Sequence, residues 1–150
     1  MFPPLPDSAF DRIDEQPDSG FYAVPRLVVH IDDATISALT RFYGEVLFAG
    51  ADVLDLMSSW VSHLPETPSL GRVAGLGMNA EELAANPRLS DAVVHDLNAD
   101  PTLPYADASF DFVLNAVSVQ YLKRPFEVFA EIGRAVSYTH LRAHETNDLI

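Results

Sequence analysis

The chain has 150 residues, of which 48% are hydrophobic, and this is enough for one domain with a single core. Nine basic residues against 22 acidic ones give a net charge of -13, which repels the phosphate backbone that a nucleic-acid-binding protein must neutralise. The lack of cysteine excludes disulfides and thiolate chemistry. No apolar run reaches the length of a membrane span, and the first six residues do not look like a signal peptide. We therefore expect a cytoplasmic protein with neither a nucleic-acid nor a membrane partner.

The N-terminal third of the chain divides into two predicted parts. Residues 1–20 hold four prolines and five acidic residues with little periodicity, which predicts an extended or disordered arm. Further on, Asp32 and Asp33 offer an N-cap for a helix that must have ended before Gly50. The apolar face of this helix is predicted to consist of Ile36, Leu39, Tyr43 and Val46.

Four short apolar segments follow, centred on Val53, Val73, Val93 and Val113, each twenty residues after the last. They are rich in β-branched or aromatic residues and are bounded by turn residues, as is typical of buried parallel strands. The intervals are long enough for helices. This spacing indicates a chain of β-α-β units.

A second helix is predicted from Phe126 to Arg134, with its inward face at Phe126, Phe129, Ala130 and Ile132 to Gly133. Beyond Val136 the sheet pattern stops, and residues 137–146 look like translated sequencing-adapter sequence joined to a fragment of a longer gene. We therefore expect a partial domain over residues 21–136 and a tail, 137–150, that contributes nothing to the fold. The alternative is a natural but divergent C-terminus.

Three segments resemble the class I S-adenosylmethionine-dependent methyltransferases, in particular the type 11 group. Residues 53–56 look like the first-strand motif and residues 73–79 like the second. Residues 103–113 differ from the family form Leu-Pro-Phe-x-Asp-x-Ser-Phe-Asp-x-Val only at Tyr105. The resemblance implies a three-layer Rossmann-like α/β fold that lacks its C-terminal strands. Its parallel strands would lie near 51–56, 72–77, 92–96 and 110–116, in the order 3-2-1-4. It also implies methyl transfer from S-adenosylmethionine to a small-molecule acceptor.

The resemblance further implies a cofactor site at the carboxyl ends of the strands, where open α/β sheets bind their ligands. Asp55 matches the acid that holds the amino-acid end of the cofactor. Met57, Ser59 and Val61 stand where the family has three glycines, so the loop should be stiffer and bulkier than usual. Ser58 and Ser59 add hydroxyl donors there. Two prolines should also shorten the helix that normally follows this loop, namely Pro65 and Pro68.

The second strand shows another departure from the family. Gly77 occupies the position of the acidic residue that holds the ribose hydroxyls. Asn79 or Glu81 would then have to reach the ribose from the start of the next helix. Met78 matches a position that often lies against the adenine face, a contact that suits a thioether.

After the third strand, Asp96 and Leu97 match the residues that meet the adenine edge. The Asp96 carboxylate would accept from the exocyclic amine, and the backbone N–H of Leu97 would lie near a ring nitrogen. The family meets its methyl acceptor after the fourth strand. The corresponding residues here, which we expect to contact substrate, are Asn115, Ser118, Gln120 and Tyr121.

In the same family, the segment before the first helix can fold over the cofactor as a lid, which makes Tyr22, Arg26 and His30 candidates for that role. His63 is close enough in sequence to the altered loop to contact ligand. His95 and Asp96 are adjacent on a predicted strand and should point to opposite faces, so they do not form an acid-base pair.

No metal site and no catalytic nucleophile is predicted. His140 and His144 are four residues apart, but the motif is not that of zinc peptidases. A strand-turn-helix elbow for a serine nucleophile is also missing. Two functions stay open: a methyltransferase acting on a small molecule, and a non-catalytic module that keeps the fold but has lost the cofactor. The sequence does not indicate the catalytic residues, the acceptor or the oligomeric state.

Overall fold

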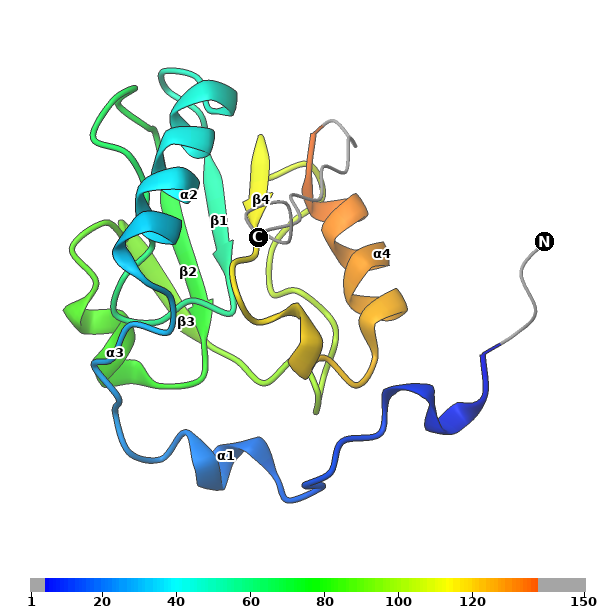
Figure 1. The fold of residues 1–150 in the computed structure, drawn as a ribbon. Helices are drawn as coiled ribbons and strands as arrows, with labels where there is room; N and C mark the ends of the chain where they lie inside the picture. The colour runs from blue at the N-terminus through cyan, green and yellow to red at the C-terminus, as the bar shows by residue number, and fades with distance from the viewer. Residues whose placement is uncertain (1–4, 138–150) are drawn as a thin grey trace.

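A computed structural model describes residues 5–137 of the chain. Its centre is a four-stranded parallel sheet in the order β3-β2-β1-β4 (Figure 1). The strands are shorter than expected, and their bounds are Val53–Leu56 for β1, Val73–Gly77 for β2, Asp91–Val94 for β3 and Phe112–Leu114 for β4. The predicted fold class, strand order and strand direction are confirmed.

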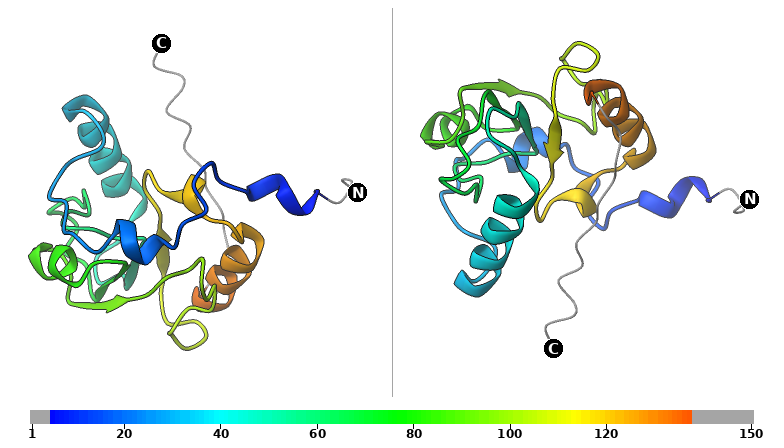
Figure 2. Two further views of the ribbon diagram at one scale, coloured as in Figure 1. Left: turned by 90° about the horizontal axis from the view of Figure 1, so that it is seen from below. Right: turned by 90° about the horizontal axis from the view of Figure 1, so that it is seen from above.

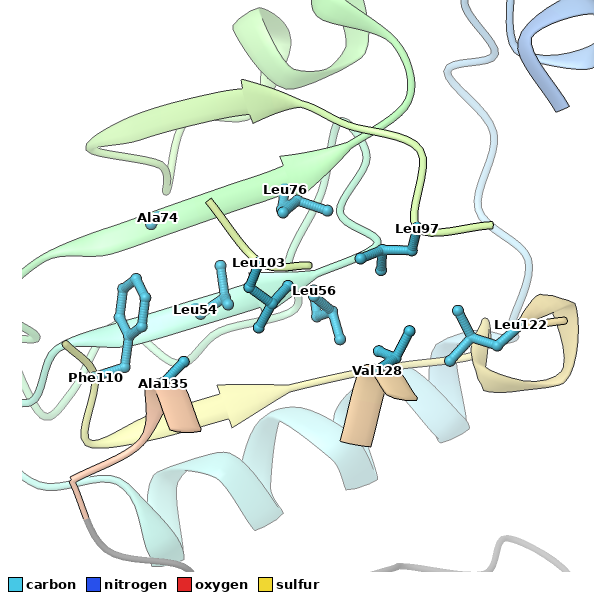
Figure 3. Packing of buried hydrophobic residues seen from close by; sticks show 10 residues of the cluster. All are labelled: Leu54, Leu56, Ala74, Leu76, Leu97, Leu103, Phe110, Leu122, Val128 and Ala135. Atoms are coloured by element: carbon cyan, nitrogen blue, oxygen red, sulfur yellow. The ribbon is translucent and has the colours of Figure 1, made fainter. Parts of the chain in front are cut away.

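Alternating side chains of the central strands feed two separate cores, one on each face of the sheet. Helix α4, Pro125–Ala135, covers the face that carries Leu54 and Leu56. Figure 3 shows the buried residues of this cluster, which are Leu54, Leu56, Ala74, Leu76, Leu97, Leu103, Phe110, Leu122, Val128 and Ala135. Helix α2, Asp33–Val46, covers the opposite face through Tyr43, which packs in the same cluster as Val53 and Val73. The domain therefore has the three layers that were expected.

Helix α2 follows its sequence signals closely. The Asp32 carboxylate accepts a hydrogen bond from the backbone N–H of Thr35, as an N-cap should. Tyr43 is buried, and three further apolar side chains are partly buried beside it, namely Leu39, Phe42 and Val46.

The predicted inward face of α4 is wrong at Phe126 and Phe129 and confirmed at Ile132. Phe126 is 66% exposed and Phe129 is 40% exposed, whereas Val128 is fully buried and Ile132 packs against the core. Val128, Ile132 and Ala135 are spaced i, i+4, i+7, so they share one stripe of the helix. Phe126 instead meets Phe10 of the N-terminal segment edge to face. The prediction favoured the large phenylalanines, whereas the buried stripe of the helix consists of smaller apolar residues.

The prediction that all four strands are buried is also wrong for β3. Three of its four residues are exposed, and only Val93 is partly covered. The strand order explains this result, since β3 lies at an edge of the sheet. The central strands β1 and β2 are buried along their whole length.

Only one of the three connections between strands contains a helix. This is α3, Ala80–Ala85, between β2 and β3. The β1–β2 connection is irregular, which agrees with the two prolines it contains, Pro65 and Pro68. The β3–β4 connection has no helix either, but it buries Leu97 and Leu103 against the sheet. These two leucines cover the surface that a crossover helix would otherwise cover.

The N-terminal segment, residues 5–30, contains a 3-10 helix, η1 at Asp7–Phe10, and the short helix α1, Asp18–Phe21. It runs beneath the arrowheads of β1 and β2 (Figure 1), and the view from below shows it crossing in front of the sheet (Figure 2). Asp18 accepts a hydrogen bond from Asn98, and Glu15 pairs with Lys123. The described part of the predicted arm, residues 5–20, therefore lies against the carboxyl ends of the strands.

The chain after α4 returns to the sheet beside β4. Val136 forms an isolated parallel bridge with Phe110, and the Ser137 amide donates to the Phe110 carbonyl at 2.9 Å. Most of the predicted tail, 138–150, with His140 and His144, lies outside the described residues.

Candidate functional site

An open pocket of about 440 Å³ lies at the carboxyl ends of β2 and β3. Parallel strands present their carboxyl ends at one edge, which is where α/β sheets bind ligands. One wall comes from the N-terminal segment and the others from the two strand ends. The lining residues are Ser19, Tyr22, Ala23, Met78, Asn79, Ala80, Glu81, Val94, His95 and Asp96.

Asp96 and Met78 give this pocket a polar acceptor and a soft apolar surface. Oδ1 of Asp96 accepts from the backbone amides of Asn98 at 2.9 Å and Ala99 at 3.2 Å, which fixes the carboxylate at the start of the turn. Both bonds use the same oxygen, so the second oxygen can accept from a ligand amine. The Met78 thioether is polarizable and packs well on a flat ring. The pair suits a heteroaromatic ring with an exocyclic amine.

His95 lines the same pocket as Asp96. β3 ends at Val94, so the strand alternation expected for these two neighbours does not extend to them. The His95 Nε2 atom contacts the Asp100 carbonyl at 2.8 Å, so the imidazole helps to hold the turn that follows β3.

Asn79 lines the pocket, but its amide is already engaged. Its Oδ1 caps α3 by accepting from the amides of Glu81 and Glu82, and its Nδ2 donates to the Tyr22 carbonyl at 2.9 Å. Asn79 therefore ties the lid candidate Tyr22 to the end of β2. The Asn79 side chain, which was expected to reach the ribose, instead caps α3 and bonds to the N-terminal segment.

Asp55 lies outside this pocket, in a buried network of its own. Asp55 is 8% exposed, and its Oδ2 accepts from the hydroxyls of Ser58 and Ser62, both at 2.6 Å. Burial raises the pKa of Asp55 to about 6, while the two hydroxyls oppose that rise. The acid expected to hold the amino-acid end of a cofactor is instead held by its own loop.

The network continues from this loop into α3 and the N-terminal segment. Asn86 donates to the Ser62 hydroxyl at 2.8 Å and to the Ser59 carbonyl at 2.9 Å. Glu82 is buried, and it accepts from the Ser59 hydroxyl and from the backbone amide of Arg26, both at 2.7 Å. Loop 57–62 is therefore fastened on two sides by side chains of the β2–β3 connection.

Gly77 lies directly beneath this loop. A Cβ atom at Gly77 would come within 2.3 Å of the Ser58 carbonyl oxygen and 3.1 Å of a Leu83 methyl. The Ser58 amide donates to the Leu76 carbonyl at 2.7 Å, so the loop is bonded to the end of β2. The space that an acidic side chain would need at position 77 is filled by the backbone of the loop.

Met57 is one of the three residues that replace glycine in this loop. Its φ of 58° lies in the left-handed region that glycine adopts without strain. Met57 thus keeps the left-handed backbone conformation that glycine favours, although the residue is no longer glycine. Its side chain is partly buried against the core on the α4 face, which offsets part of the strain.

The predicted substrate residues form a separate group after β4. The Ser118 hydroxyl donates to Oδ1 of Asn115 at 3.1 Å, while Nδ2 of Asn115 is buried without a partner among the described residues. Gln120 donates to the Val117 carbonyl, and Tyr121 is 47% exposed in the 3-10 helix η2, Val119–Tyr121. None of these residues lines the pocket described above.

Val117 should be a strained residue whose replacement by glycine stabilises the protein. Its φ of 61° is in the left-handed region, which a β-branched side chain adopts only at a cost, and its side chain is 46% exposed. We expect Val117→Gly to raise the free energy of unfolding by about 1 kcal/mol. Urea unfolding measures this change, with Val119→Gly, in η2, as the control that should destabilise. A Val117→Gly protein less stable than the wild type would contradict the prediction.

Four residues that the sequence did not single out hold the site together: Ser62, Asn86, Glu82 and Asn98. Asn98 donates to Asp18 and to the Tyr121 carbonyl, and it accepts from the Lys123 amide. It therefore joins the N-terminal segment to the region after β4. A signal existed only for Glu82, which follows the cap Asn79 by three residues, as in a capping box.

The most specific sequence motif, residues 103–113, lies away from the pocket. Arg134 of α4 donates to the carbonyls of Leu103 and Tyr105 and pairs with Asp107. The Asp111 carboxylate accepts from the Asp52 amide at 2.9 Å, at the entrance to β1. The motif therefore fixes β4 and α4 against the sheet.

The other candidates lie apart from the pocket. Arg26 stacks its guanidinium on the Phe21 ring at 3.8 Å, and His30 is exposed. The backbone carbonyl of His63 accepts from the Thr40 hydroxyl, and burial lowers the pKa of its imidazole. Leu97 packs its side chain in the core, so only its backbone remains for a ligand. Across residues 5–137, no helix is long and apolar enough to cross a membrane, and no three acidic or histidine side chains form a metal-binding group.

Comparison with known proteins gives one family and several related folds. A family described as a methyltransferase domain matches residues 57–138, more than half of the chain. The solved structure of the [4+2]-cyclase SpnF is 23% identical with a TM-score of 0.54, and covers 66% of this chain and 40% of its own. The YcgJ protein of Bacillus subtilis is 14% identical with a TM-score of 0.53, and the match covers 70% of this chain and 47% of that one. No curated protein matches. The chain thus spans less than half the length of either structure, and both likenesses concern the fold alone.

Proposed function

Because this chain belongs to the methyltransferase domain family, we propose that it is the cofactor-binding part of an enzyme that transfers methyl groups from S-adenosylmethionine to a small molecule. The observation that carries the proposal is the pocket at the ends of β2 and β3, with Met78 and Asp96 in its walls. S-adenosylmethionine is the cofactor that the family implies. When bound, it supplies a methyl group already activated by a sulfonium.

The adenine half of this cofactor fits the residues of the pocket. A volume of about 440 Å³ falls within the range of small-molecule sites. Met78 can lie on a purine face, and the second oxygen of Asp96 can accept from the exocyclic amine. Tyr22 and Ala23 would cover the ring from the N-terminal segment, which agrees with the lid predicted there.

The amino-acid half of S-adenosylmethionine does not fit the residues around Asp55 in the way that the adenine half fits the pocket. Ser58 donates a hydrogen bond to Asp55, and Ser59 donates one to Glu82 of α3. None of Asp55, Ser58 and Ser59 lines the pocket. At Gly77 no side chain is available for the ribose, and the hydroxyls of that sugar have only Asn79 and Glu81 nearby. The proposal therefore rests on the adenine end.

A small-molecule acceptor is favoured by the charge of the chain and by the group after β4. The net charge of -13 repels nucleic acids. Asn115 carries a buried amide nitrogen without a partner among residues 5–137, and such an atom can donate to a polar acceptor. Methyl transfer needs mainly alignment of donor and acceptor. A cytoplasmic location stays a prediction.

Asp96→Ala should weaken the binding of S-adenosylmethionine about tenfold, the effect of losing one hydrogen bond worth about 1.4 kcal/mol. Isothermal titration calorimetry of the two proteins measures the ratio. Asp33→Ala, on the exposed first turn of α2, is the control and should bind like the wild type. Equal affinity of Asp96→Ala and wild type would remove Asp96 from the site.

A second function is supported by the buried network. Loop 57–62 is closed on Asp55 and fastened to Glu82 and Asn86, and Gly77 cannot hold a ribose. A non-catalytic module that has lost its cofactor would show these same features. The two functions differ in one simple result, because the module should give no heat with S-adenosylmethionine at any concentration of chain or ligand.

A further inference from the structure

The pocket and the amino-acid site of the cofactor are separated by loop 57–62. Every residue that lines the pocket comes from the carboxyl end of β2 or β3, the start of α3 or the N-terminal segment. Asp55 and the loop that follows it lie on the other side of the β2 end, where Ser58 donates its amide to Leu76. A ligand in the pocket therefore meets the adenine residues without meeting Asp55.

Two independent features of the sequence keep the loop closed. Loss of the three glycines stiffens the loop, and the residues that replace them include Ser59, which bonds to Glu82. Loss of the side chain at Gly77 removes the atom that would collide with the Ser58 carbonyl at 2.3 Å. The closed position of the loop is thus favoured both by residues of loop 57–62 and by Gly77 at the end of β2.

Opening the loop would leave several buried polar atoms without partners. Asp55, Ser58, Ser62, Glu82 and Asn86 are all buried. Their hydrogen bonds run without a break from Asp55 through the two serines and Asn86, and from Ser59 through Glu82 to the Arg26 amide. A buried polar group that loses its partner is costly. Both serines bond to Oδ2 of Asp55, so a ligand ammonium could reach only Oδ1 without displacing this network.

We propose that the pocket recognises the adenosine part of its ligand and gains little affinity from an amino-acid end. This inference rests on the proposed function, because it concerns the same pocket. The ligand class is adenine nucleosides, including those that carry a thioether substituent at the 5′ position. S-adenosylmethionine would bind through its nucleoside, with its amino-acid end directed away from Asp55.

Calorimetry with adenosine, 5′-methylthioadenosine and S-adenosylhomocysteine tests the proposal directly. We expect the three dissociation constants to agree within about threefold, and inosine, which lacks the exocyclic amine, to bind at least tenfold more weakly. An affinity for S-adenosylhomocysteine tenfold or more above that of adenosine would overturn the inference while leaving the proposed function intact. No binding of any of the four would overturn both.

Backbone amide NMR shifts supply a second readout in the same titrations. Adenosine and S-adenosylhomocysteine should both shift residues 78–81 and 95–96, and neither should shift residues 55–62. Shifts at 55–62 produced by S-adenosylhomocysteine alone would show that its amino-acid end enters the loop, and would refute the proposal.

Discussion

The wild type should lose free energy of unfolding as the pH rises from about 4 to about 7, and replacing Asp55 with asparagine should remove this loss. Burial raises the pKa of Asp55 to about 6, so the folded protein holds a proton there that the unfolded chain has released. Stability is then highest below the unfolded pKa and falls as the pH rises through the folded one. A change from the ordinary aspartate pKa to about 6 corresponds to about 3 kcal/mol.

The measurement is urea unfolding of both proteins at several pH values between 4 and 8. Asparagine resembles the protonated acid, so the difference in unfolding free energy should move in favour of Asp55→Asn by about 3 kcal/mol across this range. Hydrogen bonds lower the pKa of Asp32 and Glu131, and these groups act in the opposite direction, because their stabilising contribution is lost as the pH falls. The difference between the two proteins removes their contribution. Asp33→Asn is the control, and a constant difference between wild type and Asp55→Asn would contradict the prediction.

Gly77→Asp should destabilise the protein by about 3 kcal/mol or more, although it restores the acid that the resemblance expects at this position. The new Cβ would lie 2.3 Å from the Ser58 carbonyl, and backbone cannot yield as the end of a side chain can. Overpacking of this kind costs about 1–3 kcal/mol, and the buried carboxylate adds the cost of an unpaired charge. The unfolding midpoint in urea measures the total.

Two further variants separate the causes. Gly77→Ala keeps the collision without the charge, and should account for about half of the loss. Gly133→Ala places a Cβ in open space within α4, where alanine favours the helix, so it should stabilise by about 0.5–1 kcal/mol. If Gly77→Ala were as stable as the wild type, loop 57–62 could move, and the closed network would not be a fixed part of the fold.

The sheet could be predicted from the sequence because its signals are local. Each strand is a short apolar run, and the interval of twenty residues permits a crossover between parallel neighbours. The burial of β3 was predicted wrongly for the same reason, since Ala92, Val93 and Val94 look alike whether a strand is central or at an edge. Only the strand order, which is a property of the whole domain, decides how much of β3 is covered.

The site was predictable where it uses residues next to a strand end, and not where it uses long-range bonds. Met78 comes directly after β2 and Asp96 comes two residues after β3, and both line the pocket. Glu82 bonds to an amide 56 residues earlier in the chain, and Asn98 to a carboxylate 80 residues earlier. No sequence pattern relates such partners. The prediction of Phe126 on the inward face of α4 was wrong for a similar reason, because Phe126 packs on Phe10, which is distant in the sequence.

We expect the position of the N-terminal segment to influence how fast a ligand leaves the pocket. Ser19, Tyr22 and Ala23 form one of its walls, and the segment is secured by the bond from Asn79 to the Tyr22 carbonyl and by the contact of Asp18 with Asn98. We expect a bound nucleoside to have a longer residence time while these bonds hold the segment against the strand ends.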